Sequence, residues 1–268
     1  MSRKKLTGAF LVVIRSTLRL NYRMVRAVLR PLGRRRALIL ERIWSNPSEL
    51  PDVLPVPDLI RYQMRFHHWM SNIYKFNKWE PKVTNALQGL HGSLFVDVGA
   101  NLGFYVNYLQ SNFSRTVAIE PHPILCEYLR KHHPPNCQVV EKAISKSNGT
   151  AEFHIAEGDE NFGLSSMLPV RSNLRRNSAR EKRRIIVQTE TLSKILDGRT
   201  ADLVKVDVEG AEWEVLEGAE PVMQHVISWI IELHNPEKKA ALGNYMKSFG
   251  YTCKWLDETH AYFTRPHR

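Results

Sequence analysis

The sequence lacks the features that mark secreted, disulfide-bonded or membrane-spanning proteins. Its three cysteines, Cys126, Cys137 and Cys253, form no Cys-x-x-Cys pair, and their odd number argues against a disulfide framework. The apolar run at residues 6–14 ends at Arg15, which is too short to cross a bilayer, and no small-residue cleavage site follows it. These absences predict an intracellular protein with reduced thiols.

Acidic residues are absent from the first 36 positions, which carry 11 Lys and Arg. The rest of the chain holds 27 basic and 27 acidic residues, so the whole formal net charge of +11 comes from the N-terminus. A neutral body gives no electrostatic support for nucleic-acid binding. No nucleic-acid partner is therefore expected.

The basic N-terminal segment, residues 1–44, has the pattern of an amphipathic helix. Between residues 15 and 30, five arginines recur at spacings of 4, 4, 3 and 4, which places them in one stripe beside an apolar surface. Three interpretations stay open: peripheral contact of residues 6–30 with an anionic membrane surface, packing of the apolar side on the body, and organellar targeting.

The rest of the chain divides into a lead-in and one α/β domain. Residues 45–58 contain four prolines and are typical of an extended linker, and residues 59–80 are aromatic-rich and predicted to be helical. Residues 45–90 form this lead-in, and residues 91–268 alternate expected strands and helices. Alternation predicts a doubly wound, mostly parallel sheet covered on both faces. The expected strands are 94–99, 116–121, 137–145, 184–192, 201–210, 226–234, 251–256 and 261–266, with 148–156 as a hairpin arm; the expected helices are 104–113, 123–133 and 211–220.

The stretch "FVDVGANLGFYV", residues 95–106, lacks the Gly-x-Gly-x-x-Gly pattern of a dinucleotide site. Asn101 takes the middle place and Phe104 stands where the third glycine belongs. Asp97 would repel a pyrophosphate but favours an ammonium group. S-adenosylmethionine, which has an adenosine and an ammonium but no phosphate, therefore suits Asp97, Gly99, Asn101 and Gly103 better than a nicotinamide dinucleotide.

Further cofactor contacts are expected at neighbouring strand ends, where ligands of such sheets bind. Glu120 follows the second expected strand, 17 residues after Gly103, and is placed to accept two ribose hydroxyls. Ala143 and Ile144 lie near the end of the third strand. Ser166, in the pair "SS" at 165–166, is the last candidate, with a simple turn as its alternative.

Six stretches in this order resemble the FkbM family of S-adenosylmethionine-dependent methyltransferases. They are "FVDVGANLGFY" (95–105), "VAIEPHP" (117–123), "EKAISKSNGTAEFHI" (141–155), "LSSM" (164–167), "LVKVDVEGAEWEVLEGA" (203–219) and "IIELH" (230–234). The resemblance spans roughly residues 93–234. It implies that the domain expected at residues 91–268 is a Rossmann-like class I methyltransferase, with a small-molecule, sugar or lipid hydroxyl as acceptor. Ser193 in "TLSKIL" departs from the family's usual acid.

Charged residues mark the chemical half of the predicted site. Lys205, Asp207 and Glu209 alternate with valines, so period two places them on one face, and Glu232 and His234 share a face of the next strand. If the strands are neighbours, these groups converge.

Transfer of a methyl group to a hydroxyl requires a base, for which His234 is the first candidate and Asp207 the second. Lys205 and Glu209 are expected to form an ion pair that orients the loop, rather than to react. No metal ligand set is assigned. The predicted reaction is O-methylation; the alternatives are a catalytically silent membrane-associated scaffold with the same fold and, less favoured, a nicotinamide-dependent oxidoreductase.

Overall fold

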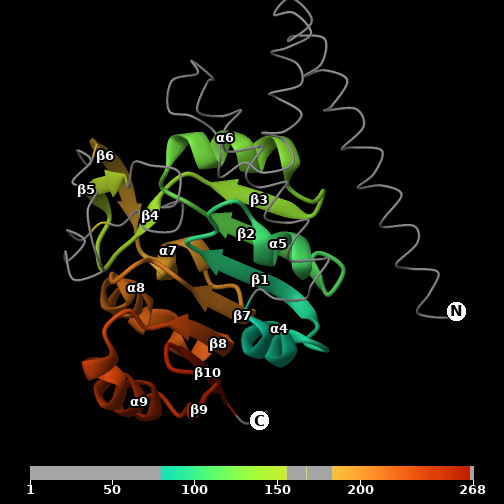
Figure 1. Ribbon diagram of the computed structural model, residues 1–268, viewed down its shortest axis with the longest axis vertical. Coiled ribbons are helices and arrows are strands. Elements are labelled where there is room, and N and C mark those ends of the chain that lie inside the picture. Colours follow the sequence, from blue (N-terminus) through green and yellow to red (C-terminus); the bar gives the residue numbers. More distant parts are fainter. Residues whose placement is uncertain (1–79, 156–166, 168–182, 266–268) are drawn as a thin grey trace, which may run out of the picture. The chain divides into compact units, whose positions relative to one another are not determined.

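The computed structural model describes residues 80–155, 167 and 183–265 (Figure 1). The predicted N-terminal helix, the proline-rich linker and the helix expected up to residue 79 lie outside these ranges. None of the helices within them combines the length and apolar composition that crossing a membrane requires.

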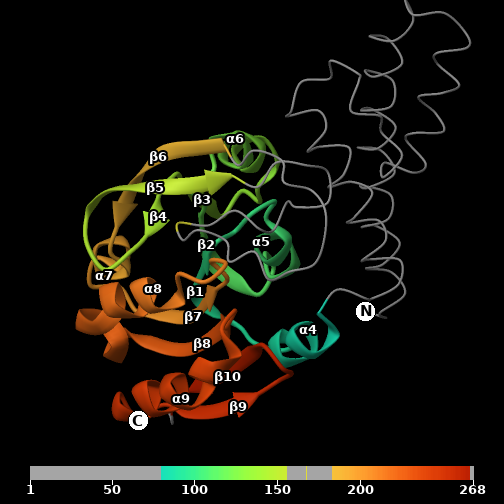
Figure 2. The same cartoon turned by 60° about the vertical axis from the view of Figure 1, so that its left-hand side comes forward.

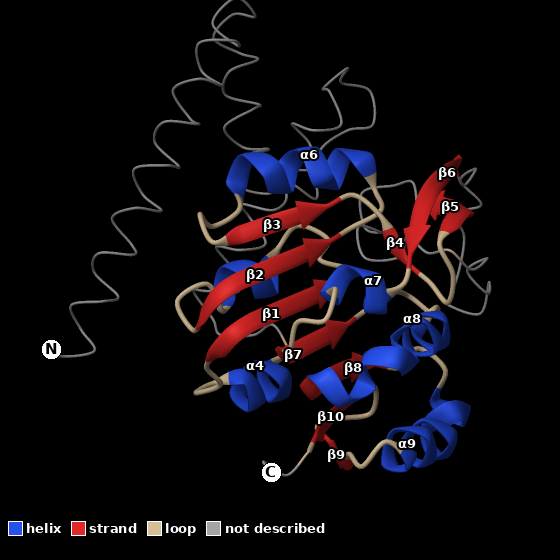
Figure 3. Ribbon diagram, turned by 180° about the vertical axis from the view of Figure 1, so that it is seen from behind, coloured by secondary structure: helices blue, strands red, loops and turns tan. Residues whose placement is uncertain are grey.

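Seven strands of the described residues form one mixed sheet in the order β3-β2-β1-β7-β8-β10-β9 (Figure 3). The contacts among β1, β2, β3, β7 and β8 are parallel, and β10 runs antiparallel to both β8 and β9. This confirms the predicted Rossmann-like, mostly parallel sheet. The strands are β1 (Gly92–Val98), β2 (Phe113–Ile119), β3 (Cys137–Val140), β7 (Ala201–Val206), β8 (Val226–Glu232), β9 (Thr252–Trp255) and β10 (His260–Thr264).

Helices cover both faces of this sheet because side chains alternate along its central strands. Phe95, Leu203 and Ile230 pack with α4 and α5 on one face, whereas Val96 and Val204 belong to the core on the opposite face. Figure 3 shows α7 and α8 in front of the sheet. The helices are α4 (Pro81–Leu87), α5 (Phe104–Tyr108), α6 (Pro123–His132), α7 (Leu192–Leu196), α8 (Glu212–Ala219) and α9 (Lys239–Ser248), with 3-10 turns η3 (Glu220–His225) and η4 (Pro236–Lys238).

Helix α4 brings the end of the lead-in into the core of the domain. Val83 and Leu87 are buried, and they join the cluster that contains Phe95 and Phe104. The residue before α4, Glu80, has a positive φ of 38° and marks the point where the chain turns into the helix.

The expected single strand at 137–145 is wrong, because the chain there divides between two sheets. β3 ends at Val140, and the chain turns there, with the amide of Lys142 donating a hydrogen bond to the carbonyl of Val140. β4 (Ala143–Ile144) then pairs with β6 rather than with the main sheet. The second sheet has the order β4-β6-β5, with β5 (Gly149–Ile155) antiparallel to β6 (Arg183–Glu190), and is seen separately in Figure 2.

The helices also differ from the sequence-based expectation, which included neither α4 nor α7. The helix predicted at 104–113 ends at Tyr108, because Phe113 already begins β2 and packs its ring 5.6 Å from that of Phe95. Helix α9 was not predicted; its buried residues, Leu242 and Met246, are four apart and so lie on one face.

Candidate functional site

The loop after β1 is held by backbone hydrogen bonds to the end of β2. The amides of Gly99 and Ala100 both donate to the carbonyl of Ile119, at 2.9 and 3.0 Å. Gly99 has φ +82°, and a Cβ atom there would lie 1.8 Å from the carbonyl oxygen of Asp207. This glycine is therefore required by close packing of the β1 loop against the segment after β7.

Glu120 lies directly after β2 and is bound to the same loop. Its Oε2 accepts a 2.8 Å hydrogen bond from the amide of Asn101, and its Oε1 accepts one of 2.9 Å from the amide of His122. Glu120 is only 5% exposed, and this burial raises the pKa of its carboxyl to about 7 although both amides oppose the shift. Asn101 keeps a left-handed φ of 49°.

A buried charge cluster lies between β1 and β7. Asp97 and Lys205 are direct partners in the parallel register, and both are buried. The Oδ1 atom of Asp97 has no hydrogen-bond partner among the described residues, and burial raises the pKa of this carboxyl to about 7 despite the charge of Lys205. The Lys205 ammonium is 3.0 Å from Oδ2 of Asp207 and 4.6 Å from the ring centre of Tyr105.

The expected ion pair between Lys205 and Glu209 is replaced by two other pairs. Strand β7 ends at Val206, so Asp207 and Glu209 lie in the loop and no longer follow the strand's alternation. Glu209 has a positive φ of 53°, and its Oε2 is 3.2 Å from Nε2 of His234. Lys205 pairs with Asp207 instead.

His234 lies among three carboxylates. Its Nδ1 is 2.8 Å from Oε1 of Glu212, and its Nε2 is 3.2 Å from Glu209 and 3.7 Å from Oε1 of Glu232. Although burial opposes it, the hydrogen bonds to Glu209 and Glu212 raise the pKa of His234 to about 11. In this arrangement the imidazole carries a positive charge at neutral pH.

The predicted convergence of charges at the carboxyl ends of β7 and β8 is confirmed. One ligand atom each of Asp207, Glu232 and His234 lies within 4.8 Å of the others. The sequence did not identify Glu212, which is 2% exposed and also accepts a 2.8 Å hydrogen bond from the amide of Gly210. The only feature of the sequence that could have pointed to Glu212 is its position two residues after Gly210.

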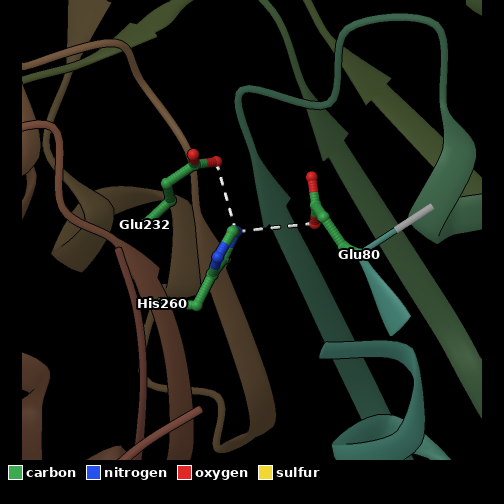
Figure 4. Close-up of side chains that lie close together, drawn as sticks. All are labelled: Glu80, Glu232 and His260. Carbon is green, nitrogen blue, oxygen red and sulfur yellow. Dashed lines mark ion pairs between the residues drawn. The ribbon is translucent and has the colours of Figure 1, made fainter. Parts of the chain in front are cut away.

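A second group consists of Glu80, Glu232 and His260, of which the sequence identified only Glu232 (Figure 4). Glu80 comes from the turn before α4, and its Oε2 accepts a hydrogen bond from the hydroxyl of Tyr105. His260 begins β10, for which only a closing strand without a defined turn was predicted. The group therefore brings a residue of the lead-in, Glu80, next to the end of β8 and the start of β10.

The remaining predicted cofactor residues have different surroundings. Gly103, with φ +80°, precedes α5, and a Cβ there would lie 2.7 Å from Cδ2 of Leu129 on α6. Ala143 and Ile144 are buried in hydrophobic clusters, so their side chains are part of the packing. Ser166 lies outside the described residues. Contacts of these four residues with a cofactor stay predictions.

Comparison with known proteins identifies the family of this domain. The family described as "Methyltransferase FkbM domain" matches residues 97–260, which is more than half of the chain. The chain belongs to this family, and its sheet has the class I methyltransferase type of fold that the sequence predicted.

A curated relative and two solved structures are similar to the chain. The methyltransferase sdnD of Sordaria araneosa is 28% identical over 156 residues, which are 47% of this chain and 60% of the relative, so this chain spans less than two thirds of its length. A methyltransferase FkbM from Methylobacillus flagellatus KT is 18% identical, with a TM-score of 0.48 over 78% of this chain and 55% of that one. TrmK of M. capricolum, solved with S-adenosyl-homocysteine, is 12% identical, with a TM-score of 0.36 over 68% and 66%.

Proposed function

We propose that the protein is an S-adenosylmethionine-dependent methyltransferase that methylates a hydroxyl of a small molecule, sugar or lipid. The observation that carries the proposal is the 2.8 Å contact of Glu120 with the amide of Asn101, next to the buried carboxylate of Asp97. This arrangement offers an acceptor for ribose hydroxyls and an acid for an ammonium. Membership of the FkbM methyltransferase family supports the reaction class.

The side chains present fit a cofactor that carries positive charge. Asp97 Oδ1 is buried and unpaired among the described residues, so an ammonium donor nearby would remove the cost of that isolated oxygen. Each oxygen of Glu120 accepts one amide and retains a further lone pair for a hydroxyl. A pyrophosphate would instead face both carboxylates.

S-adenosylmethionine supplies an electrophilic methyl group on its sulfonium. The chain's task is to align the acceptor and to take the proton that the hydroxyl loses. Asp207 is the acceptor of that proton in our proposal. Its side chain is 26% exposed, and although burial opposes it, Lys205 holds the pKa of this carboxyl below its usual range, so it is ionised at neutral pH.

His234 has a positioning role in this scheme. Its raised pKa makes it a cation that keeps no free lone pair, because its two nitrogens face Glu212 and Glu209. It therefore orders the loop after β7 and the start of α8. The sequence-based choice of His234 as the base is the competing scheme.

The first test is calorimetric titration of the full chain with S-adenosylhomocysteine, with NAD run in parallel. We expect micromolar or tighter binding of S-adenosylhomocysteine and no heat with NAD. Glu120→Gln is the matched variant, because it keeps the shape of the side chain but removes its charge, and it should weaken binding. Heat with NAD alone would favour an oxidoreductase, and no binding of either would favour a scaffold.

The acceptor and the N-terminal segment need separate tests. Incubation with radiolabelled S-adenosylmethionine and a panel of hydroxyl-bearing lipids, glycans and small molecules should label one of these classes. Peripheral membrane contact of residues 6–30 remains part of the proposal, since this stretch is basic and partly apolar. Co-sedimentation of the full chain with anionic vesicles, but not with neutral ones, is the expected result.

A further inference from the structure

The strand register brings Glu232 and His260 together at one edge of the sheet. Glu232 is the last residue of β8, His260 is the first of β10, and the two are direct partners in the antiparallel ladder. Glu80 reaches the same point from the turn before α4. Figure 4 shows both carboxylates approaching the same ring nitrogen of His260 from two different directions.

That nitrogen is buried, and no hydrogen bond to it is present among the residues that the structure describes. His260 is 4% exposed, and its Nε2 makes no hydrogen bond of acceptable geometry within the described part of the chain. The nearest acidic oxygens are Oε2 of Glu232 at 3.4 Å and Oε2 of Glu80 at 3.5 Å. Nε2 is thus within ion-pair distance of two carboxylates but makes a hydrogen bond of acceptable geometry with neither of them.

The other nitrogen of His260 fixes the form of the ring. Nδ1 is 3.0 Å from Oδ1 and 3.1 Å from Oδ2 of Asp257, and a carboxylate can only accept, so Nδ1 carries a proton. In the neutral ring, Nε2 then presents its lone pair to the space shared with Glu80 and Glu232. A histidine whose second nitrogen is held by a carboxylate is the usual arrangement for a metal ligand.

We propose that Glu80, Glu232 and His260 bind a divalent transition-metal ion, with Asp257 holding His260 in place. Ligands at about 2.0–2.2 Å from a tetrahedral ion are about 3.3–3.6 Å apart, which agrees with the two separations of 3.4 and 3.5 Å. One imidazole and two carboxylates suit Zn²⁺ or Mn²⁺ better than Ca²⁺ or Mg²⁺, which take mostly oxygen ligands.

The neighbouring group of Asp207, Glu232 and His234 is less suited to an ion. There Lys205 already neutralises Asp207 at 3.0 Å, and both nitrogens of His234 face other carboxylates. Glu232 lies between the two groups, with Oε2 toward His260 and Oε1 toward His234. An ion at the first group would therefore adjoin the proposed methyl-transfer site without depending on its activity.

The test uses the full-length protein, stripped with EDTA and titrated with ZnCl₂, MnCl₂ or MgCl₂ in equilibrium dialysis without cofactor. We expect one Zn²⁺ or Mn²⁺ per chain in preference to Mg²⁺. His260→Gln and Glu80→Gln should each weaken the affinity at least about 100-fold, and Asp257→Asn about 10- to 100-fold, since it removes only the support of a ligand.

Two further variants separate this site from other histidines. His154→Gln changes a histidine that lies 3.2 Å from Glu152 in the second sheet, and it should leave the affinity unchanged. His234→Gln probes the neighbouring group and should change the affinity less than His260→Gln. Circular dichroism checks that each variant is folded, and Glu80→Gln provides a second test if His260→Gln is not.

Zinc X-ray absorption gives a readout that is independent of enzyme activity. We expect a shell of oxygen and nitrogen at about 2.0 Å that includes one imidazole, and the imidazole signal should disappear in His260→Gln. The proposal is overturned if no ion binds at 100 µM, if Glu80→Gln and His260→Gln bind as well as the wild type, or if only His234→Gln abolishes binding.

Discussion

The two halves of the candidate site are built from different parts of the chain. At the ends of β1 and β2, the candidate site is formed by backbone amides and one glycine, and the amide of Asn101 donates a hydrogen bond to Glu120. At the ends of β7 and β8, charged side chains from distant segments form a network that includes Lys205, Asp207 and His234. The first half depends on local backbone geometry, and the second depends on long-range register.

This difference predicts different responses to mutation. Changes in the β1 loop should act on folding and on cofactor affinity, because that loop also packs against the carbonyl of Asp207. Changes in the charged half should act on turnover and on the pH dependence of stability. Four experiments test this division, in order of decreasing expected effect.

Asp207→Asn should give the largest effect, a fall in kcat of about 10²–10⁴, because the proposed proton acceptor is lost while its shape is kept. Single-turnover methyl transfer to the acceptor found by the labelling screen measures this. Binding of S-adenosylhomocysteine should change little. His234→Gln is the comparison, and a fall in kcat as large as that of Asp207→Asn would make His234 the base.

Lys205→Met should destabilise the protein by about 3 to 5 kcal/mol, because it leaves buried carboxylates without their cation. The loss should be larger at pH 8 than at pH 5, because without Lys205 the burial of Asp97 and Asp207 raises the pKa of both carboxyls and lets them become neutral at the lower pH. Urea unfolding at both pH values measures it. Lys194→Met is the control: its ion pair with Glu190 is 2.8 Å long but the lysine is 61% exposed, so less than about 1 kcal/mol is expected.

Gly99→Ala should cost roughly 3 kcal/mol, from a positive φ and a Cβ that would overlap a backbone oxygen. Gly198→Ala is the matched control, because Gly198 has a similar φ of +75° but no atom within 4 Å of its added Cβ. That control should lose only about 1 to 2 kcal/mol. Equal losses in urea unfolding would show that close packing of the β1 loop contributes nothing.

The raised pKa of Glu120 predicts a smaller effect, which is a pH dependence of stability and of cofactor affinity. Its folded pKa of about 7 is above the ordinary value of 4.5, so the folded state holds this proton more tightly and the unliganded protein loses stability as pH rises from 4.5 to 7. A carboxylate that accepts ribose hydroxyls must be ionised, so S-adenosylhomocysteine should bind more tightly as pH rises through 7. Titrations between pH 5.5 and 8.5 measure this.

In Glu120→Gln the slope of log Kd against pH should decrease by up to one. Asp97, whose pKa burial also raises to about 7, should account for the slope that remains. An unchanged slope in the variant would assign the whole pH dependence of cofactor binding to Asp97 or to another group.

Sequence patterns alone were enough to predict which segments form the parallel sheet and where the glycine loop after β1 lies, the loop at which we propose that the cofactor binds. Val96, Val117 and Val204 lie in short, mostly apolar strands, and Gly99 and Gly103 supply two of the positive φ angles in the loop after β1. These signals are local, because burial pattern and backbone conformation depend on neighbours in the chain. The division of residues 137–145 between two sheets has no such signal.

The pairing of the charged groups, by contrast, depends on where the strands end and how they align. Lys205 pairs with Asp207 because β7 ends at Val206, and His260 meets Glu232 because β10 takes one register on β8. Glu80 joins them from a segment that the sequence assigned to a lead-in. Glu80, Glu232 and His260 are far apart in the chain and come together only after the strands have paired. The backbone hydrogen bonds between strands are made by nearly every residue type, so the sequence pattern does not record this pairing.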